Sequence, residues 1–185
     1  MTRTYRVAGI SGSLRNGSYN TATLRAAQEL APESLDIDIV TLEDVPLFNE
    51  DVEAIGWPDR VRDLREQVQA ADAVIFASPE YNYSIAGVLK NAIDWLSRPE
   101  GEAPLNGKPA TIVGATPAFV GTARGQAHLR QVVFYNAMPL LPTAEVLIAR
   151  AGERFDDTGR LTDEETRAVL RDMLEKLAAW IERHA

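Results

Sequence analysis

Short apolar runs alternate along the chain with segments whose apolar residues recur every three or four positions. The first pattern predicts β-strands, and the second predicts amphipathic α-helices. The runs that begin at Asp72 and Pro109 are almost continuously apolar, as in strands that helices cover on both faces. Strands are expected at residues 5–10, 35–40, 72–78, 109–116 and 144–149, and helices at residues 20–31, 58–70, 85–96, 124–137 and from 162 onward.

The start of the last helix carries a signal of its own. Thr162 and Glu165 form the T-x-x-E pattern of a capping box, in which each side chain satisfies a backbone N–H at the helix start. The helix is then expected to bury a stripe at helical spacing, made of Val169, Met173, Leu177 and Trp180.

Five strand–helix units in succession predict a parallel sheet with helices on both faces. Because crossovers of this kind are right-handed, the expected architecture is a doubly wound α/β domain. The Gly- and Pro-rich segment at residues 98–109 is expected to be a surface loop, since the alternation resumes after it. A length of 185 residues favours a single domain over residues 1–185.

Charge and composition narrow the classes of partner. The formal net charge of −8 disfavours nucleic acids and anionic membranes, whose binders rely on basic patches. The N-terminal MTRTYRVAGI lacks the apolar core of a signal peptide, and no apolar run approaches the roughly 20 residues of a membrane span. We therefore expect a cytoplasmic protein that binds neither nucleic acid nor membrane.

The chain has no cysteine and only two histidines, His128 and His184. Disulfides, thiolate metal sites and a cysteine nucleophile are therefore excluded. The histidines have no ligand partner nearby in the sequence, and the acids of PLFNEDVE at residues 46–53 lack the spacing of a metal site. No metal is expected, and the histidines are expected at the surface or at helix ends.

The segment GISGSLRNGSYN places several hydroxyl side chains between the first strand and the first helix. In an open α/β sheet, ligands bind beyond the carboxyl ends of the strands, and the N-terminus of a helix attracts anions there. Hydroxyl and amide donors together with one fixed cation suit a terminal phosphate. The residues expected to form this site are Ser11, Ser13, Arg15, Ser18, Asn20 and Thr21.

Two common phosphate motifs do not match this loop. It has no lysine, which the nucleotide P-loop requires, and its glycines lack the G-x-G-x-x-G spacing of a dinucleotide site. Hydroxyl side chains instead favour a phosphomonoester such as that of FMN. The alternative is a loop that only caps the helix, although a cap needs one hydroxyl and not four.

A second constellation, SPEYNYSIAGVLKNAIDWL, follows the third strand and should lie at the same edge of the sheet. The loop offers two aromatic rings and a row of backbone amides between strand and helix. A flavin ring needs a flat apolar wall and hydrogen bonds to its pyrimidine edge, and this loop is able to supply both. The residues concerned are Pro79, Glu80, Tyr81, Asn82 and Tyr83.

These two motifs, together with PLFNEDVE at residues 46–53, resemble the NADPH-dependent FMN reductase family over nearly the whole chain. The family includes bacterial quinone, chromate and azo-dye reductases. The resemblance implies a flavodoxin-like fold with strand order 2-1-3-4-5, FMN as cofactor, and NADPH or NADH as co-substrate. It implies phosphate binding by the first loop, with Tyr19 included, and flavin-ring contacts along residues 79–83.

The fourth-strand loop departs from the family pattern of a serine and a Gly-Gly pair. Here it reads ATPAFVGTARGQ, with a single glycine, Gly121, before Thr122. The resemblance still implies that this loop borders the flavin, through Ala115, Thr116 and Pro117.

The resemblance also implies a homodimer or homotetramer, with the flavin near the subunit interface. Helices 85–96 and 124–137 are the candidate interface elements, with Trp95, Phe134 and Tyr135 as anchors. The alternative places these aromatic side chains in the intrachain core, because patterning does not separate two kinds of burial.

The expected reaction passes hydride from NAD(P)H through FMN to a quinone or a similar small acceptor, with chromate, azo dyes and free flavin as further possibilities, in ping-pong order. No side chain is expected to act as acid or base, Tyr81 and Tyr83 are expected to line the substrate face, and Arg15 or Arg124 is a candidate for the 2′-phosphate of NADPH. The alternatives are a flavodoxin-type electron carrier and a non-catalytic flavin-binding module.

Overall fold

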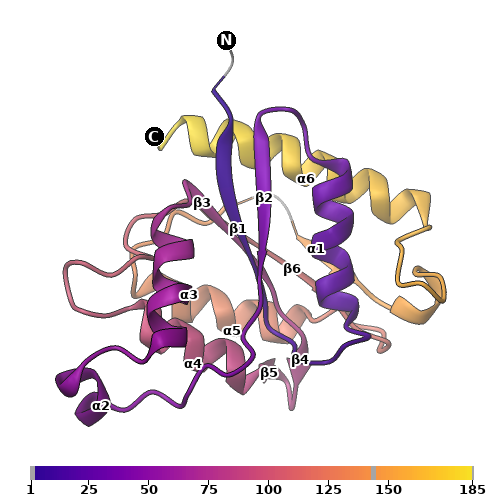
Figure 1. Ribbon diagram of the computed structural model, residues 1–185. Helices are drawn as coiled ribbons and strands as arrows, with labels where there is room; N and C mark the ends of the chain where they lie inside the picture. Colours follow the sequence, from indigo (N-terminus) through magenta and orange to yellow (C-terminus); the bar gives the residue numbers. More distant parts are fainter. Residues whose placement is uncertain (1–2, 143–144, 185) are drawn as a thin grey trace.

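The computed structural model describes residues 3–142 and 145–184. Its centre is a five-stranded parallel sheet with strand order β2-β1-β3-β6-β7, as predicted for a flavodoxin-like fold (Figure 1). The strands are β1 (Tyr5–Ser11), β2 (Leu35–Val40), β3 (Ala73–Ala77), β6 (Ala110–Ala115) and β7 (Val146–Ile148), and a small antiparallel pair consists of β4 (Glu80–Tyr81) and β5 (Ser84–Ile85).

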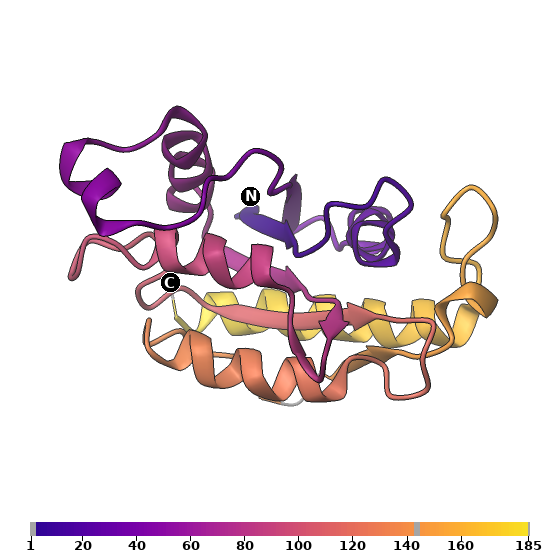
Figure 2. The same ribbon diagram turned by 90° about the horizontal axis from the view of Figure 1, so that it is seen from below.

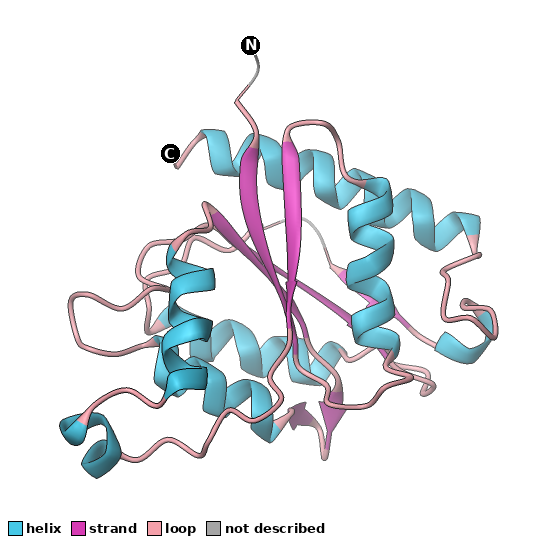
Figure 3. Ribbon diagram, in the orientation of Figure 1, coloured by secondary structure: helices cyan, strands magenta, loops and turns pink. Residues whose placement is uncertain are grey.

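Helices cover both faces of the sheet, which Figures 2 and 3 show from two sides. One apolar core lies between the sheet and the pair α1 (Tyr19–Leu30) and α6 (Glu164–Glu182). A second core lies between the opposite face and three helices, α3 (Asp59–Gln69), α4 (Gly87–Leu96) and α5 (Ala123–Phe134). Strands β3 and β6 are buried along their whole length, as their continuous apolar runs predicted.

Several expected boundaries shift in the structure. Helix α4 begins at Gly87 and not at residue 85, because Ser84 and Ile85 pair with β4. Helix α5 ends at Phe134, and Ala137 adopts a left-handed φ of 49° beyond it. The strand expected at 144–149 spans only Val146–Ile148, and its expected first residue lies outside the described residues.

The capping box expected at Thr162 is wrong. Helix α6 begins at Glu164, and the side chain of Asp163 accepts from the backbone N–H of Thr166. Asp163 is the better cap here because its carboxylate also pairs with Arg154, at 2.6 Å. Met173 and Leu177 are buried as expected, whereas Val169 is 45% exposed. Trp180 is half-buried, and the rest of the buried stripe is Leu170, Leu174 and Ile181.

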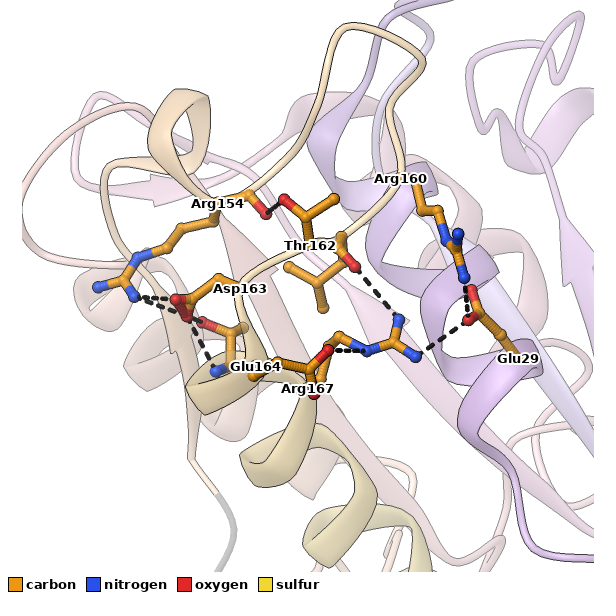
Figure 4. A network of polar contacts seen from close by, with 9 residues as sticks. Glu29, Arg154, Arg160, Thr162, Asp163, Glu164 and Arg167 are labelled. Atoms are coloured by element: carbon orange, nitrogen blue, oxygen red, sulfur yellow. Dashed lines mark hydrogen bonds and ion pairs between the residues drawn. The ribbon is translucent and has the colours of Figure 1, made fainter.

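The segment that leads into α6 is tied to α1 by the arginine network of Figure 4, made of Glu29, Arg154, Arg160, Asp163 and Arg167. Arg160 and Arg167 both donate to one oxygen of Glu29, at 2.9 and 3.0 Å. The hydrogen bonds from Arg160 and then Arg167 lower the pKa of Glu29 from 4.5 to about 2. This network joins the two helices that cover the same face of the sheet.

An unpredicted short helix, α2 (Glu50–Ile55), lies in the PLFNEDVE segment. This segment is fastened to α4, because Asn91 accepts from the N–H of Phe48 at 2.8 Å and the indole of Trp95 donates to Pro46 O at 2.8 Å. Trp95 is fully buried within the chain, so the hypothesis that it anchors an interface is wrong. No helix among the described residues is both long and apolar enough to span a bilayer.

Candidate functional site

The loops that follow β1, β3 and β6 meet at one edge of the sheet. Ser11 and Ala77, the last residues of β1 and β3, are register partners, and the N–H of Gly12 donates to Ala77 O at 2.8 Å. After β1 the next strand, β2, lies on one side of it, whereas β3, β6 and β7 follow one another on the other side. The strand order therefore reverses between β1 and β3. Ligands of open α/β sheets bind at such a switch point.

The hydroxyl groups of the first loop converge as the sequence predicted. Ser11, Ser13 and Ser18 are all buried. The hydroxyl of Ser11 lies 2.8 Å from that of Thr21, and Ser18 Oγ accepts from the N–H of Thr21 at 3.2 Å. Ser18 is therefore the N-cap of α1, and because its oxygen acts there as an acceptor, its own O–H remains able to donate to a ligand.

The backbone of this loop is rich in unused donors. Among the described residues, the N–H groups of residues 16–20 have no hydrogen-bond acceptor. The last of them belong to the first turn of α1, where the positive end of the helix dipole lies. Arg15 adds an exposed guanidinium that donates to Gly17 O at 2.9 Å. This donor set fits a terminal phosphate.

Two residues of the expected phosphate site make other contacts with their side chains. The amide of Asn20 donates to Ala115 O and accepts from Ala115 N–H, both at 3.0 Å, and so braces the start of α1 against the end of β6. The ring of Tyr19 packs against Phe155 at a centroid distance of 5.4 Å. Both residues contribute backbone N–H groups to the loop, a contribution that residue type alone does not reveal.

The second loop forms the β4–β5 hairpin. Its two turn residues, Asn82 and Tyr83, have φ values of 50° and 62°, the combination required by a two-residue type I′ turn. Left-handed backbone is uncommon for a tyrosine, so the turn presents this ring at some conformational cost.

Glu80 anchors this hairpin to α5. Its Oε2 accepts from the N–H groups of Arg124 and Gly125, each at 3.0 Å, and its side chain is 9% exposed. Thr122, at the N-cap position of α5, makes no side-chain cap and has a left-handed φ of 67°. Glu80 therefore supplies the missing cap from another part of the chain, while its expected place along the flavin ring stays a prediction.

The two exposed tyrosines of the hairpin lie in different surroundings. Tyr83 stacks under the guanidinium of Arg124, whose Cζ lies 4.1 Å from the ring centroid. Tyr81 lines a hollow of about 330 Å³ that the first two loops share. The other residues that line this hollow are Gly12, Ser13, Leu14, Arg15, Ala86, Gly87 and Val88. The structure thus brings the predicted phosphate loop and one predicted ring-stacking residue together.

The third loop of the site follows β6 and lies at the same edge of the sheet. Thr116 is held by its N–H to Ile148 O at 2.9 Å, and Pro117 is exposed. Gly114 admits no side chain, because a Cβ there would lie 2.7 Å from Ser78 O. Phe119 is 79% exposed beside this edge, an aromatic position that the sequence reasoning missed because nothing in its spacing marks it.

No group of three His, Cys, Asp or Glu side chains is arranged to hold a metal among the described residues. His128 and His184 are both exposed, as expected. His128 contacts the hydroxyl of Ser84 at 3.0 Å, and the ring nitrogen of His184 lies 2.8 Å from Trp180 O.

Comparison with known proteins agrees with this geometry. The chain is 50% identical to an NAD(P)H-dependent FMN reductase of Pseudomonas aeruginosa, over 99% of this chain and 98% of that protein. It is 42% identical to a quinone reductase of Pseudomonas putida, over 98% and 97% of the two chains. The solved structure of FerB, a flavoenzyme NAD(P)H:(acceptor) oxidoreductase from Paracoccus denitrificans, matches with a TM-score of 0.89 at 34% identity, over 98% of this chain and 99% of that one.

The family model described as NADPH-dependent FMN reductase matches residues 5–153, which hold all three loops of the site. The chain therefore belongs to the NADPH-dependent FMN reductase family, as its loop motifs predicted.

Proposed function

We propose that this protein is an FMN-dependent oxidoreductase that passes hydride from NAD(P)H to quinones or similar small acceptors. The observation that carries the proposal is the convergence of buried hydroxyls and unpaired N–H groups at the switch point, beside a hollow lined by Tyr81. The names of the relatives, FMN reductase and quinone reductase, support the same reading.

The residues present suit FMN. The first loop would hold the phosphate through the hydroxyls of Ser11, Ser13, Ser18 and Thr21, the N–H groups of residues 16–20 and the charge of Arg15. Tyr81 would offer a wall for the ring. The places of Pro79, Glu80 and Asn82 along the ring, and of Ala115, Thr116 and Pro117 at its border, stay predictions. When bound, FMN supplies the hydride-accepting and hydride-donating chemistry.

The chain's own task is to bind and to position. No acidic or basic side chain lines the hollow except Arg15, which fits a reaction that needs no protein acid or base. Tyr81 and Tyr83 are exposed at the edge, where planar donors and acceptors can stack. Arg124 is stacked on Tyr83 and paired with Glu80, and Arg15 is assigned to the FMN phosphate, so neither candidate for a 2′-phosphate is preferred.

We further propose that donor and acceptor occupy this face in turn, which predicts ping-pong kinetics. An open face would admit acceptors of several shapes, and reduction of chromate, azo dyes or free flavin would then follow from the same site. The cytoplasmic location expected from the sequence stays a prediction.

A homodimer or homotetramer is also proposed, with α4 and α5 as the interface. Phe134 and Tyr135 are 81% and 71% exposed, and aromatic side chains are enriched at interface cores. Tyr135 also lines a hollow of about 340 Å³ together with Phe48 and residues of α4. Light scattering of Phe134→Asp should give a smaller assembly than the native chain.

Anaerobic stopped-flow absorbance tests the function. FMN-loaded protein is mixed with NADPH or NADH and then with a benzoquinone. Rapid bleaching of the flavin band followed by rapid recovery is expected, and the faster donor identifies the nicotinamide preference. Bound flavin that neither donor bleaches would favour an electron carrier or a flavin-binding module. Parallel lines in double-reciprocal plots are expected for the ping-pong order.

A further inference from the structure

The chain contains two Asn-Gly pairs in exposed turns, Asn16–Gly17 and Asn106–Gly107. In such a pair the backbone nitrogen of glycine is able to attack the side-chain carbonyl of asparagine. The amide leaves as ammonia and a cyclic imide forms, which water then opens to aspartate or isoaspartate. No oxidant or other reagent is needed. Glycine favours the step because it has no side chain to obstruct the attack and its backbone is mobile.

The structure distinguishes the two pairs. The N–H of Gly107 donates to Asn136 O at 3.0 Å, and its backbone is held at a φ of 69°. The N–H of Gly17, in contrast, has no acceptor among the described residues, although both glycines have open space where a Cβ would stand. The side-chain amides of Asn16 and Asn106 both lack a hydrogen-bond partner among the residues described, so the difference between the pairs lies at the glycine nitrogen. The glycine nitrogen of the first pair is therefore freer to attack, because that of the second must first give up its hydrogen bond.

We infer that Asn16 is a site of spontaneous deamidation that lowers the affinity of the first loop for its phosphate ligand. The modification follows from the turn itself, whereas its effect on affinity rests on the function proposed above. Asn16 stands two residues before the N-cap Ser18, within the run of unpaired N–H groups. A carboxylate at this position would occupy the positive end of α1 and repel a phosphate.

Occupancy of the site should in turn protect it. A phosphate that accepts from the N–H groups of residues 16–20 would engage the Gly17 nitrogen that the reaction requires. Protein without ligand should therefore change faster than loaded protein. The fraction of Asn16 that is deamidated would thus increase with the time that the protein spends without its cofactor.

Peptide mass spectrometry tests the modification without reference to activity. Flavin-free protein is incubated in mildly alkaline buffer, with and without added FMN, and both Asn-Gly peptides are followed. Conversion at Asn16 is expected to be roughly fivefold faster than at Asn106, the factor that corresponds to one backbone hydrogen bond at Gly107. Added FMN should slow only the first site. Asn16→Gln, the matched control, should remain unconverted at residue 16.

The effect on affinity is measured with Asn16→Asp. It should bind FMN roughly tenfold more weakly than the native chain and melt at no lower temperature, because the new charge favours the helix end while it opposes phosphate. Equal conversion at the two pairs, or native FMN affinity of Asn16→Asp, would overturn the inference. If the native chain bound no FMN, the proposed function would fail, but the ratio of the two conversion rates would still decide whether Asn16 is the reactive site.

Discussion

Replacement of Glu80 by alanine is the sharpest test of how the β4–β5 hairpin is held. The carboxylate accepts two backbone N–H groups at the start of α5, each at 3.0 Å, and α5 has no other side-chain cap. Loss of a cap costs about 1–2 kcal/mol, and hydrogen bonds to a charged group are at the upper end of that range or above it. The pair with the exposed guanidinium of Arg124, at 3.5 Å, adds a few tenths of a kcal/mol at most.

We therefore expect Glu80→Ala to lower the free energy of unfolding by about 2 kcal/mol, which corresponds to a fall in Tm of about 4–8 °C for a chain of this size. Glu80→Gln keeps an acceptor without the charge and should lose about half as much. The control is Glu175→Ala on α6, an exposed acid that makes no ion pair among the described residues.

Urea unfolding, monitored by circular dichroism, measures the free energy of unfolding of all three variants. FMN titration of the folded proteins measures how the hairpin affects the affinity for FMN. Glu80→Ala should bind FMN more weakly, because the hairpin that carries Tyr81 loses its anchor on α5. If Glu80→Ala were as stable as Glu175→Ala, the carboxylate would not be the cap of α5, and the positioning role would be refuted.

Three further changes probe other parts of the fold. Asn20→Ala leaves the buried N–H and C=O of Ala115 unpaired and should cost about 3 kcal/mol in urea unfolding; a loss below about 1 kcal/mol would mean that the brace is unimportant. Gly114→Ala places a Cβ 2.7 Å from Ser78 O, so little soluble protein should form, and a normal yield would contradict the close packing. The pKa of Glu29 is lowered from 4.5 to about 2, so its ion pairs contribute to the free energy of unfolding above pH 4.5, and this contribution is lost as the pH falls toward 2. The difference in Tm between the native chain and Glu29→Gln should therefore shrink between pH 4.5 and 2. A difference that stayed constant would show that the ion pairs do not cause it.

The architecture was predictable because its signals are local and repeated. The apolar runs at residues 72–78 and 109–116 correspond to the fully buried strands β3 and β6, and helical spacing located α1, α3, α4 and α5 to within a few residues. A strand that is buried on both faces consists almost entirely of apolar residues, so β3 and β6 are easily recognised in the sequence.

Side-chain roles at the site were less accessible to sequence reasoning. Ser18 and Thr21 come together as expected, because both belong to one helix start. Asn20 and Glu80 have their partners 95 and 44 positions away, at Ala115 and Arg124, and a pattern read along the chain does not register such pairs. The residue type indicated in both cases that the side chain forms hydrogen bonds. Which backbone groups are its partners depends on the fold.

The β4–β5 hairpin illustrates the same limit. A two-residue type I′ turn favours asparagine at its first position but ordinarily glycine at its second, and here Tyr83 occupies the second. The stacking of Arg124 on the Tyr83 ring and the anchor at Glu80 hold this turn, and both arise from α5. The helix expected from residue 85 was consequently placed two residues too early.

The most direct measurement compares the binding of FMN and riboflavin to the flavin-free protein by fluorescence titration. The two ligands differ only by the phosphate, so the ratio of their dissociation constants reports on the first loop alone. We predict that FMN binds at least about a hundredfold more tightly, as several charge-assisted hydrogen bonds require, and that Ser11→Ala with Ser18→Ala narrows the gap. Equal affinities for the two ligands would contradict the assignment of a phosphate site to this loop.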